Sequence, residues 1–177
     1  VIVSAGGGAV GQKLMAAALA ARPLTRAASA TWRFLLGSAR GVDGMASSAA
    51  AQSGIVVEPA RADFLRLLPN CRLAIGQGGY NTLMETVRVR VPAVAVPFSG
   101  GGETEQTMRV ERLRELGYVQ SVAEAELEPR RLAKACDAAL AAGIPPNVPW
   151  RMDGAVCRSA VLRSKSSSLT GRRHTPI

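Results

Sequence analysis

The segment LAIGQGGYNTLME at residues 73–85 contains the pattern that best predicts the fold of this chain. It opens with a short apolar run of the kind that ends a buried strand. Three glycines follow, and they allow a sharp turn and a close approach of the backbone to a ligand. Thr82 and Glu85 then fit a capping box, which predicts a helix that starts near Thr82. A strand, a glycine turn and a helix N-terminus present backbone N–H groups and a partial positive charge, which suit an anion such as a phosphate.

The same segment has a purely structural interpretation. A capping box needs no ligand, and glycine turns are common in α/β proteins. Glu85 in particular could serve only as the capping partner of Thr82. The segment alone therefore leaves a ligand site and a structural turn both open.

The composition is that of one globular domain. The chain has 177 residues, of which 47% are apolar, and no run approaches the roughly 20 apolar residues of a membrane-spanning helix. It begins on the strand-like segment Val1–Val3 without an initiator Met, so we expect a fragment that has lost N-terminal sequence. Three cysteines, Cys71, Cys136 and Cys157, are far apart and lack C-x-x-C spacing. We therefore expect free thiols in a reducing compartment, and a cytoplasmic protein.

The charged and aromatic residues argue against several function classes. The net charge of +9 could favour an anionic partner, but Arg is scattered and only 4% of the residues are aromatic, so few rings are available to stack on bases. We expect no nucleic-acid partner. His174 is the only histidine and lies in the basic tail, which argues against a Cys/His metal site and against a His-dependent triad.

Strand-like and helix-like segments alternate along the chain, which is typical of a parallel sheet covered by helices on both faces. We predict an α/β, Rossmann-like domain of about six parallel strands over residues 1–163, followed by a disordered basic tail at 164–177. The expected strands are 1–4, 31–36, 55–57, 71–75, 91–96 and 118–122, and the expected helices are 12–21, 43–53 with Asp43 as its cap, 63–68, 82–88, 103–116, 129–142 and 150–163.

Four connections follow strands of this predicted sheet, and three of them are rich in glycine. Ligands bind at the carboxyl ends of the strands in such sheets, so this concentration at one edge predicts a binding site there. The connections are 5–11, 58–62, 76–82 and 98–106.

The first glycine loop also permits a different interpretation. Gly6, Gly8 and Gly11 satisfy G-x-G-x-x-G, the dinucleotide-binding fingerprint. The fingerprint expects an acidic residue at the end of the second strand, but the segment 37–40 contains none. Arg40 could instead meet the 2′-phosphate of NADP, so an NADP-binding oxidoreductase domain is an alternative. A non-catalytic interaction module that has kept the fold is a further alternative.

Residues 63 to about 140 resemble the C-terminal half of family-28 glycosyltransferases. The best-known members of that family are the N-acetylglucosamine transferases that make the lipid-linked peptidoglycan precursor. The order and the spacing of the shared positions are kept. These positions are the strand before Gly76, Gly79-x-x-Thr82-x-x-Glu85, Val91-Pro92-Ala93-Val94-Ala95-Val96-Pro97, Glu105-Gln106, Leu113, Gly117 and the helix that begins at Pro129.

The resemblance implies the GT-B fold, in which two Rossmann-like domains face a cleft. The C-terminal domain of such an enzyme binds the nucleotide-sugar donor, usually UDP-linked. No cofactor or metal is then expected, in line with the lack of an Asp-x-Asp pair in this chain. The N-terminal domain binds the acceptor and usually supplies the catalytic base, so the base is expected on a missing domain or a partner subunit. The chain alone would bind a donor with poor turnover or none and could self-associate, and the complete enzyme could associate peripherally with a membrane.

The resemblance also implies roles for individual residues in nucleotide-sugar binding. Glu85 would accept hydrogen bonds from the ribose hydroxyls, and Gln106, with Glu105 beside it, would contact the donor sugar. The segment 58–62, which includes Arg61, would hold the edge of the base. The phosphates would lie near Gly6, Gly7 and Gly8, and the diphosphate site would be lined by Gly78, Gly79, Asn81 and Thr82.

Two positions depart from the family. Gln77 stands where the family often has a basic residue, and Arg109 stands where it often has an Asn. The first glycine loop also differs from the family in its spacing. These departures leave the base and the sugar of the donor open.

Overall fold

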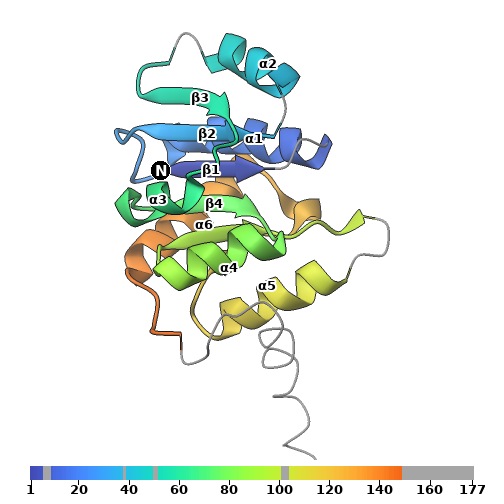
Figure 1. The fold of residues 1–177 in the computed structure, drawn as a ribbon, viewed down its shortest axis with the longest axis vertical. Helices are drawn as coiled ribbons and strands as arrows, with labels where there is room; N and C mark the ends of the chain where they lie inside the picture. The colour runs from blue at the N-terminus through green and yellow to red at the C-terminus, as the bar shows by residue number, and fades with distance from the viewer. Residues whose placement is uncertain (6–8, 38, 50–51, 101–103, 149–177) are drawn as a thin grey trace, which may run out of the picture. The chain divides into compact units, whose positions relative to one another are not determined.

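The strands of the described residues form one six-stranded, fully parallel sheet in the order β3-β2-β1-β4-β5-β6 (Figure 1). The computed structural model describes residues 1–5, 9–37, 39–49, 52–100 and 104–148. The chain order reverses between β1 and β4, which makes this the switch point at which such sheets bind ligands. All six predicted strands are confirmed. Their bounds are β1 Ile2–Ala5, β2 Trp32–Leu36, β3 Ile55–Pro59, β4 Ala74–Gln77, β5 Ala93–Val96 and β6 Gln120–Ser121.

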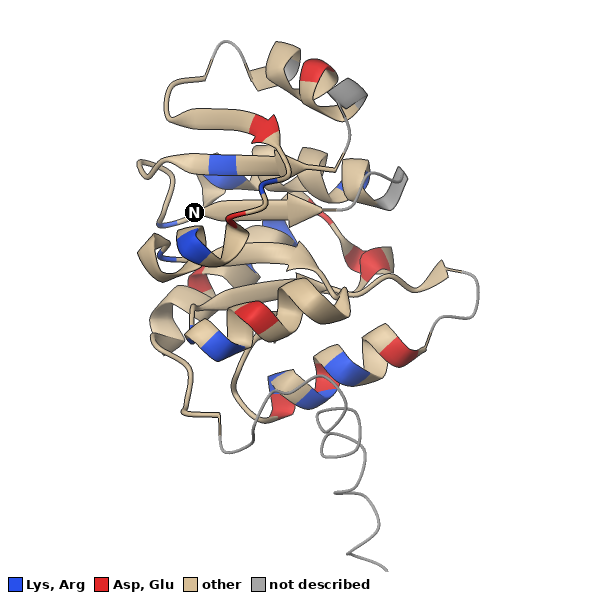
Figure 2. Ribbon diagram, viewed as in Figure 1, with Lys and Arg blue, Asp and Glu red and all other residues tan. Residues whose placement is uncertain are grey.

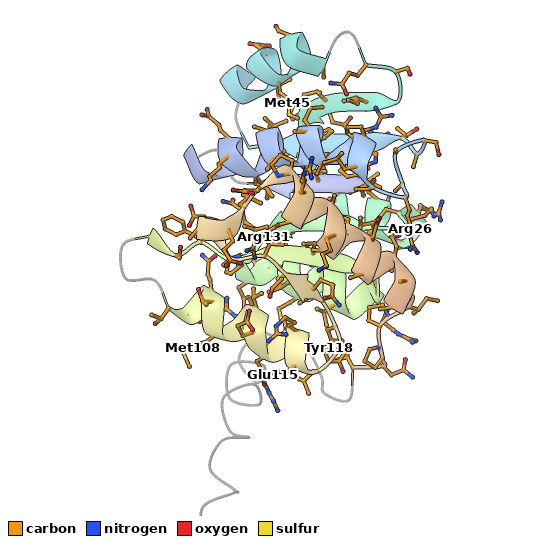
Figure 3. The ribbon with its side chains drawn as sticks, turned by 180° about the vertical axis from the view of Figure 1, so that it is seen from behind. Arg26, Met45, Met108, Glu115, Tyr118 and Arg131 are labelled. Atoms are coloured by element: carbon orange, nitrogen blue, oxygen red, sulfur yellow. The ribbon has the colours of Figure 1, made fainter. Side chains whose placement is uncertain are left out.

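Helices cover both faces of this sheet, as predicted. Figure 1 shows α3 and α4 on the face toward the viewer, and Figure 3, drawn from behind, shows α1 and α6 side by side on the other face. The helix α2 packs along the edge strand β3, and α5 packs near β6. The helices are α1 Ala9–Ala21, α2 Ala39–Ala49, α3 Phe64–Leu67, α4 Tyr80–Val89, α5 Glu105–Glu115 and α6 Pro129–Ala142, with short 3-10 turns at Arg22–Leu24, Leu68–Asn70 and Glu124–Glu126.

The core lies between the sheet and α1 and α6. The strands contribute fully buried Val3, Phe34 and Ile75, and the two helices contribute Leu14 and Leu132. Strands covered on both faces are apolar almost throughout, which is why the strand signals in the sequence were continuous apolar runs. The compact unit spans Val1–Asn147. The predicted helix 150–163 and the tail 164–177 lie outside the described residues.

The predicted capping box at the start of α4 is wrong. The helix begins at Tyr80, with Gly79 as its N-cap, and no side chain caps it. The Leu83 N–H already donates to the Gly79 carbonyl at 3.1 Å, so the first turn closes before Thr82 could cap it. Glu85 therefore does not serve as a capping partner. The prediction of Asp43 as a cap is also wrong, because α2 begins at Ala39 and Asp43 lies in its second turn.

The strand β4 runs further than predicted, through Gly76 to Gln77. Gly76 pairs with Ser4 of β1, and a Cβ at position 76 would lie 3.2 Å from the Ser4 hydroxyl oxygen. The glycine that the sequence placed in a turn therefore lies in the sheet, where its missing side chain makes room for Ser4. The turn itself is reduced to Gly78 and Gly79.

Left-handed residues end three of the helices. Gly117 and Gly143 follow α5 and α6 with φ of 77° and 74°, which confirms the predicted helix ends. Arg90 ends α4 with φ of 61°, a conformation that favours glycine. Its guanidinium Nε donates to the Pro145 carbonyl at 2.8 Å, which ties the end of α4 to the segment after α6.

Candidate nucleotide-binding cleft

A cleft of about 530 Å³ opens at the carboxyl ends of the central strands. Its volume lies in the range of about 300–1,000 Å³ that is typical of small-molecule sites. Three of the four connections that the sequence singled out contribute to it, namely those that follow β1, β3 and β4. The lining residues are Ser4, Ala5, Leu35, Gly37, Ala60, Arg61, Ala62, Phe64, Leu65, Gln77, Gly79, Thr82 and Glu85.

One wall of the cleft is the start of α4. Gly79, Thr82 and Glu85, to which the family resemblance gives roles in nucleotide-sugar binding, line it. A helix leaves its first N–H groups without intrahelical acceptors, so this wall presents donors and a partial positive charge. Among the described residues no hydrogen bond or ion pair engages the half-buried Glu85 carboxylate. This carboxylate is therefore available to accept hydrogen bonds from a ligand.

The opposite wall follows β3 and is held by an ionic network. Arg61 donates from Nε and Nη2 to the two carboxylate oxygens of Asp63 at 2.8 and 2.7 Å, and its Nη1 lies 3.5 Å from Glu58. Glu58 also accepts from Arg33 at 2.5 Å. These hydrogen bonds raise the pKa of Arg61 and lower the pKa of Asp63. Two carboxylates thus balance the charge of Arg61, so Arg61 is a weaker anion site than its position suggests.

Two apolar side chains complete the cleft, and the sequence did not single them out. Phe64 and Leu65 of α3 line it, and Leu65 is 43% exposed. The signal was present, because 63–68 has more apolar residues than one buried helix face needs. Ser4 and Gln77 were likewise missed as lining residues, and each is a polar residue at the end of an otherwise apolar strand.

Gly78 and Asn81 do not line the cleft, although both stand in the predicted diphosphate site. Gly78 is buried, its N–H donates to the Val96 carbonyl at 3.3 Å, and a Cβ there would lie 2.9 Å from Val110. Its lack of a side chain therefore serves packing. Asn81 is exposed on the first turn of α4.

The predicted sugar contacts lie at the start of α5, beyond the lining of the cleft. Glu105 forms an ion pair with Arg109. The Gln106 side-chain oxygen accepts a hydrogen bond from the Phe98 N–H at 3.4 Å, which ties the first turn of α5 to the end of β5. Figure 2 shows that acidic and basic residues alternate along α5. The surface of this helix therefore has no net charge of one sign that would attract an anion by itself.

Several predicted positions cannot be placed. Gly6, Gly7 and Gly8 lie outside the described residues, and so does the side chain of Arg40. In the part of the chain that the structure describes, no group of three or more His, Cys, Asp or Glu side chains converges to hold a metal ion. None of the described helices is long and apolar enough to cross a membrane.

The fold is shared with solved glycosyltransferases. MurG of Acinetobacter baumannii is 17% identical with a TM-score of 0.57, and the match covers 81% of this chain and 46% of MurG. The glycosyltransferase VinC, solved in complex with DTDP, is 20% identical with a TM-score of 0.58, over 79% of this chain and 33% of VinC. ALG13 is 15% identical with a TM-score of 0.52, over 71% of this chain and 80% of ALG13. These likenesses define the class of fold, which is that of a GT-B glycosyltransferase domain.

The chain belongs to glycosyltransferase family 28: its residues 4–143 match the C-terminal domain of that family. A curated relative, an uncharacterized glycosyltransferase MK0977 of Methanopyrus kandleri, is 34% identical over 83 residues. That match covers 47% of this chain and 24% of the relative. The chain thus spans about a quarter of this relative and about half of MurG. The predicted family and fold are confirmed.

Proposed function

We propose that this chain is the donor-binding half of a glycosyltransferase that transfers a sugar from a UDP-type nucleotide-sugar to an acceptor. The observation that carries the proposal is the cleft at the switch point. One of its walls combines the backbone N–H groups at the start of α4 with the unengaged carboxylate of Glu85. Family membership supports the transferase class. The complex of VinC with DTDP supports a nucleoside diphosphate as the ligand of this fold.

Each wall of the cleft suits one part of such a donor. The diphosphate would lie at the N-terminus of α4 near Gly79 and Thr82, where backbone N–H groups and the helix dipole favour negative charge. Glu85, one turn further along α4, would accept hydrogen bonds from the ribose diol. The base would lie between the backbone of Ala60–Ala62 and the apolar side chains of Phe64 and Leu65.

The chemistry needs a group that stabilises the departing nucleoside diphosphate. Negative charge develops on its phosphate as the bond to the sugar breaks. The N–H groups and the dipole at the start of α4 would stabilise that charge, and no cofactor or metal ion is part of the proposal.

The acceptor and the catalytic base belong to the other half of the enzyme in this proposal. That half would be a further domain or a partner subunit, since the chain spans only a fraction of MurG and of MK0977. The chain by itself would then bind the donor and show little or no transfer. Peripheral membrane association would come through the complete enzyme.

Isothermal titration of the chain with UDP, UDP-N-acetylglucosamine, dTDP, GDP and NADP, without added metal, tests the proposal. We expect a nucleoside diphosphate or its sugar to bind. Glu85→Gln should weaken that binding about 10- to 100-fold, because a hydrogen bond to a charged group contributes about 1.5–3 kcal/mol. The matched control is Glu115→Gln on α5, whose carboxylate is exposed and pairs with Arg112. Binding of NADP alone, or unchanged binding in Glu85→Gln, would contradict the proposal.

A further inference from the structure

A groove of about 250 Å³ lies between α6 and the edge strand β6. It shares no lining residue with the cleft described above, and the proposed function does not use it. Figure 3 looks onto the face of the sheet that α6 covers and labels Arg131, which lines the groove. One wall is the segment 120–122, and the other is α6, which contributes Arg131, Lys134, Ala135 and Ala138.

The strand wall has an open side. β6 is the last strand of the sheet, and Ser121 pairs in register with Ala95 of β5. The Val122 N–H donates to the Ala95 carbonyl at 3.1 Å, and backbone groups of successive strand residues point to opposite sides, so those of Ser121 point away from β5. No strand among the described residues pairs with that side. The wall therefore presents a backbone N–H and a carbonyl to an additional strand.

The helix wall supplies positive charge and little bulk. Arg131 donates through Nη1 to the Glu126 carboxylate at 2.8 Å, and the two side chains are 60% and 53% exposed. In the part of the chain that the structure describes, no hydrogen bond or ion pair engages the exposed Lys134 side chain. Ala135 and Ala138 lie beside Lys134 in the lining and leave space for the side chains of another segment. The groove thus combines one unbalanced positive charge with an open sheet edge.

We propose that this groove binds an extended, acidic segment of a partner protein, which adds to β6 as a seventh strand. Alternate side chains of an added strand face α6, so acidic side chains in that register would meet Lys134. β6 has only two residues, so its backbone groups alone would hold a strand weakly, and the charge of the helix wall selects the segment. Strand addition of this kind takes affinity from the main chain and specificity from alternate side chains.

The charge of the chain argues against the chain itself as the occupant. Its segment 149–177 contains six Arg and Lys residues but only one acidic residue, Asp153. A second copy carries the same net charge of +9 and is repelled at long range. A partner segment of opposite charge is therefore the better match for the groove.

Fluorescence anisotropy on the whole 177-residue chain tests this inference at low ionic strength, where charges are least screened. The probe is the peptide Glu-Val-Glu-Val-Glu, labelled with fluorescein at its N-terminus and amidated at its C-terminus. We expect Lys134→Glu to weaken its binding at least about tenfold, because like charges then face each other. The same peptide with Gln in place of Glu should bind the unmodified chain at least about fivefold more weakly.

The matched control is Arg130→Glu on the same helix. Arg130 is exposed and does not line the groove. The control makes the same change in net charge, so it reports any long-range electrostatic effect on peptide binding. We expect it to weaken binding less than about threefold.

Methylation of the peptide backbone tests strand addition without any change to the protein. N-methyl groups at every second residue remove the N–H groups from one side of an extended strand and leave the peptide charge unchanged. Only one of the two registers faces β6. We expect a loss of about fivefold or more in one register and of less than about twofold in the other.

Four results would overturn the inference. They are no binding of the Glu peptide to the unmodified chain at about 1 mM, equal binding of the Gln peptide, equal effects of Arg130→Glu and Lys134→Glu, and equal effects of the two methylation registers. A dimer in sedimentation equilibrium that Lys134→Glu abolishes would also overturn it, because a second copy then occupies the groove. UDP should bind Lys134→Glu and the unmodified chain equally, so the inference and the proposed function are tested separately.

Discussion

Gly78 and Gly79 are adjacent, and the structure predicts opposite effects for the same substitution at the two positions. A Cβ at Gly78 would lie 2.9 Å from a methyl group of Val110 and 3.2 Å from the Pro97 Cα. A Cβ at Gly79 would meet no atom within 4 Å. Gly79 has φ of −57° and ψ of 135°, which any residue can adopt. Alanine is therefore crowded at one position and accommodated at the other.

The magnitude follows from what must move at position 78. Carbon atoms in contact prefer separations of about 3.5–4.0 Å, so the new methyl group would overlap both neighbours. Val110 is β-branched and fully buried in a helix, where its χ1 angle is restricted, and the Pro97 contact is backbone. Overpacking of this kind costs about 1–3 kcal/mol. Alanine also lowers the conformational entropy of the unfolded chain, which stabilises the folded state by about 0.4–1 kcal/mol. The net loss for Gly78→Ala is then about 1–2 kcal/mol.

Urea unfolding followed by circular dichroism measures this loss, and a thermal melt gives a second estimate. A loss of that size lowers Tm by about 2–8 °C in a domain of this length. Gly79→Ala should leave the free energy of unfolding unchanged or raise it by up to about 1 kcal/mol. It should instead weaken UDP binding, because Gly79 lines the cleft. A Gly78→Ala variant as stable as the unmodified chain would refute the assignment of Gly78 to packing.

Three further predictions follow from individual side chains. Burial raises the pKa of the Cys136 thiol from its ordinary value of 9.0 to about 12. Because the pKa is higher in the folded chain, the stability that the neutral thiol contributes is complete below pH 9 and is lost as the pH rises toward 12. The difference in free energy of unfolding between the unmodified chain and Cys136→Ala should therefore shrink over that range, as measured by urea titrations. Trp32 is fully buried and donates from Nε1 to the Ala27 carbonyl at 3.0 Å, so Trp32→Phe should lower the free energy of unfolding by about 2–4 kcal/mol, and a loss below about 1 kcal/mol would contradict this. Leu65→Ser should change that free energy by less than about 0.5 kcal/mol but weaken UDP binding about fivefold, and equal UDP affinity in titration would argue against Leu65 as part of the base wall.

Most of the secondary structure could be predicted because its signals are local. The apolar runs around Val94 and Ile75 are short and lie between turn signals, which favours buried strands, and Pro129 and Gly143 mark both ends of α6. The predictions were wrong where a contact with a residue far away in the sequence decided the local structure. The sequence predicted a turn at Gly76, but this residue pairs with Ser4 of another strand, whose hydroxyl a Cβ at position 76 would crowd.

The candidate site could be predicted only in part, for the same reason. Gly79 and Thr82 lie in a connection that the rule of ligand binding at strand ends singled out, and Glu85 was assigned through the family resemblance; all three line the cleft. Their neighbour Gly78 was assigned the same role, because no sequence pattern distinguishes a glycine that contacts a ligand from one that contacts Val110. Arg61 was assigned to the edge of the base with the segment 58–62, but no sequence pattern showed that Asp63 and Glu58 would pair with its guanidinium.

The alternation of strands and helices, the parallel sheet and the edge at which the loops gather could all be predicted from the residue pattern. These properties follow from periodicity, from glycine and proline sterics and from chain connectivity, all of which act between residues close together in the chain. The strand order and the residues that share the cleft became clear from the folded chain. The same is true of the contact of Arg109 with Tyr80 and of its ion pair with Glu105. Those features depend on contacts between segments far apart in the chain, and such contacts exist only once the sheet has assembled.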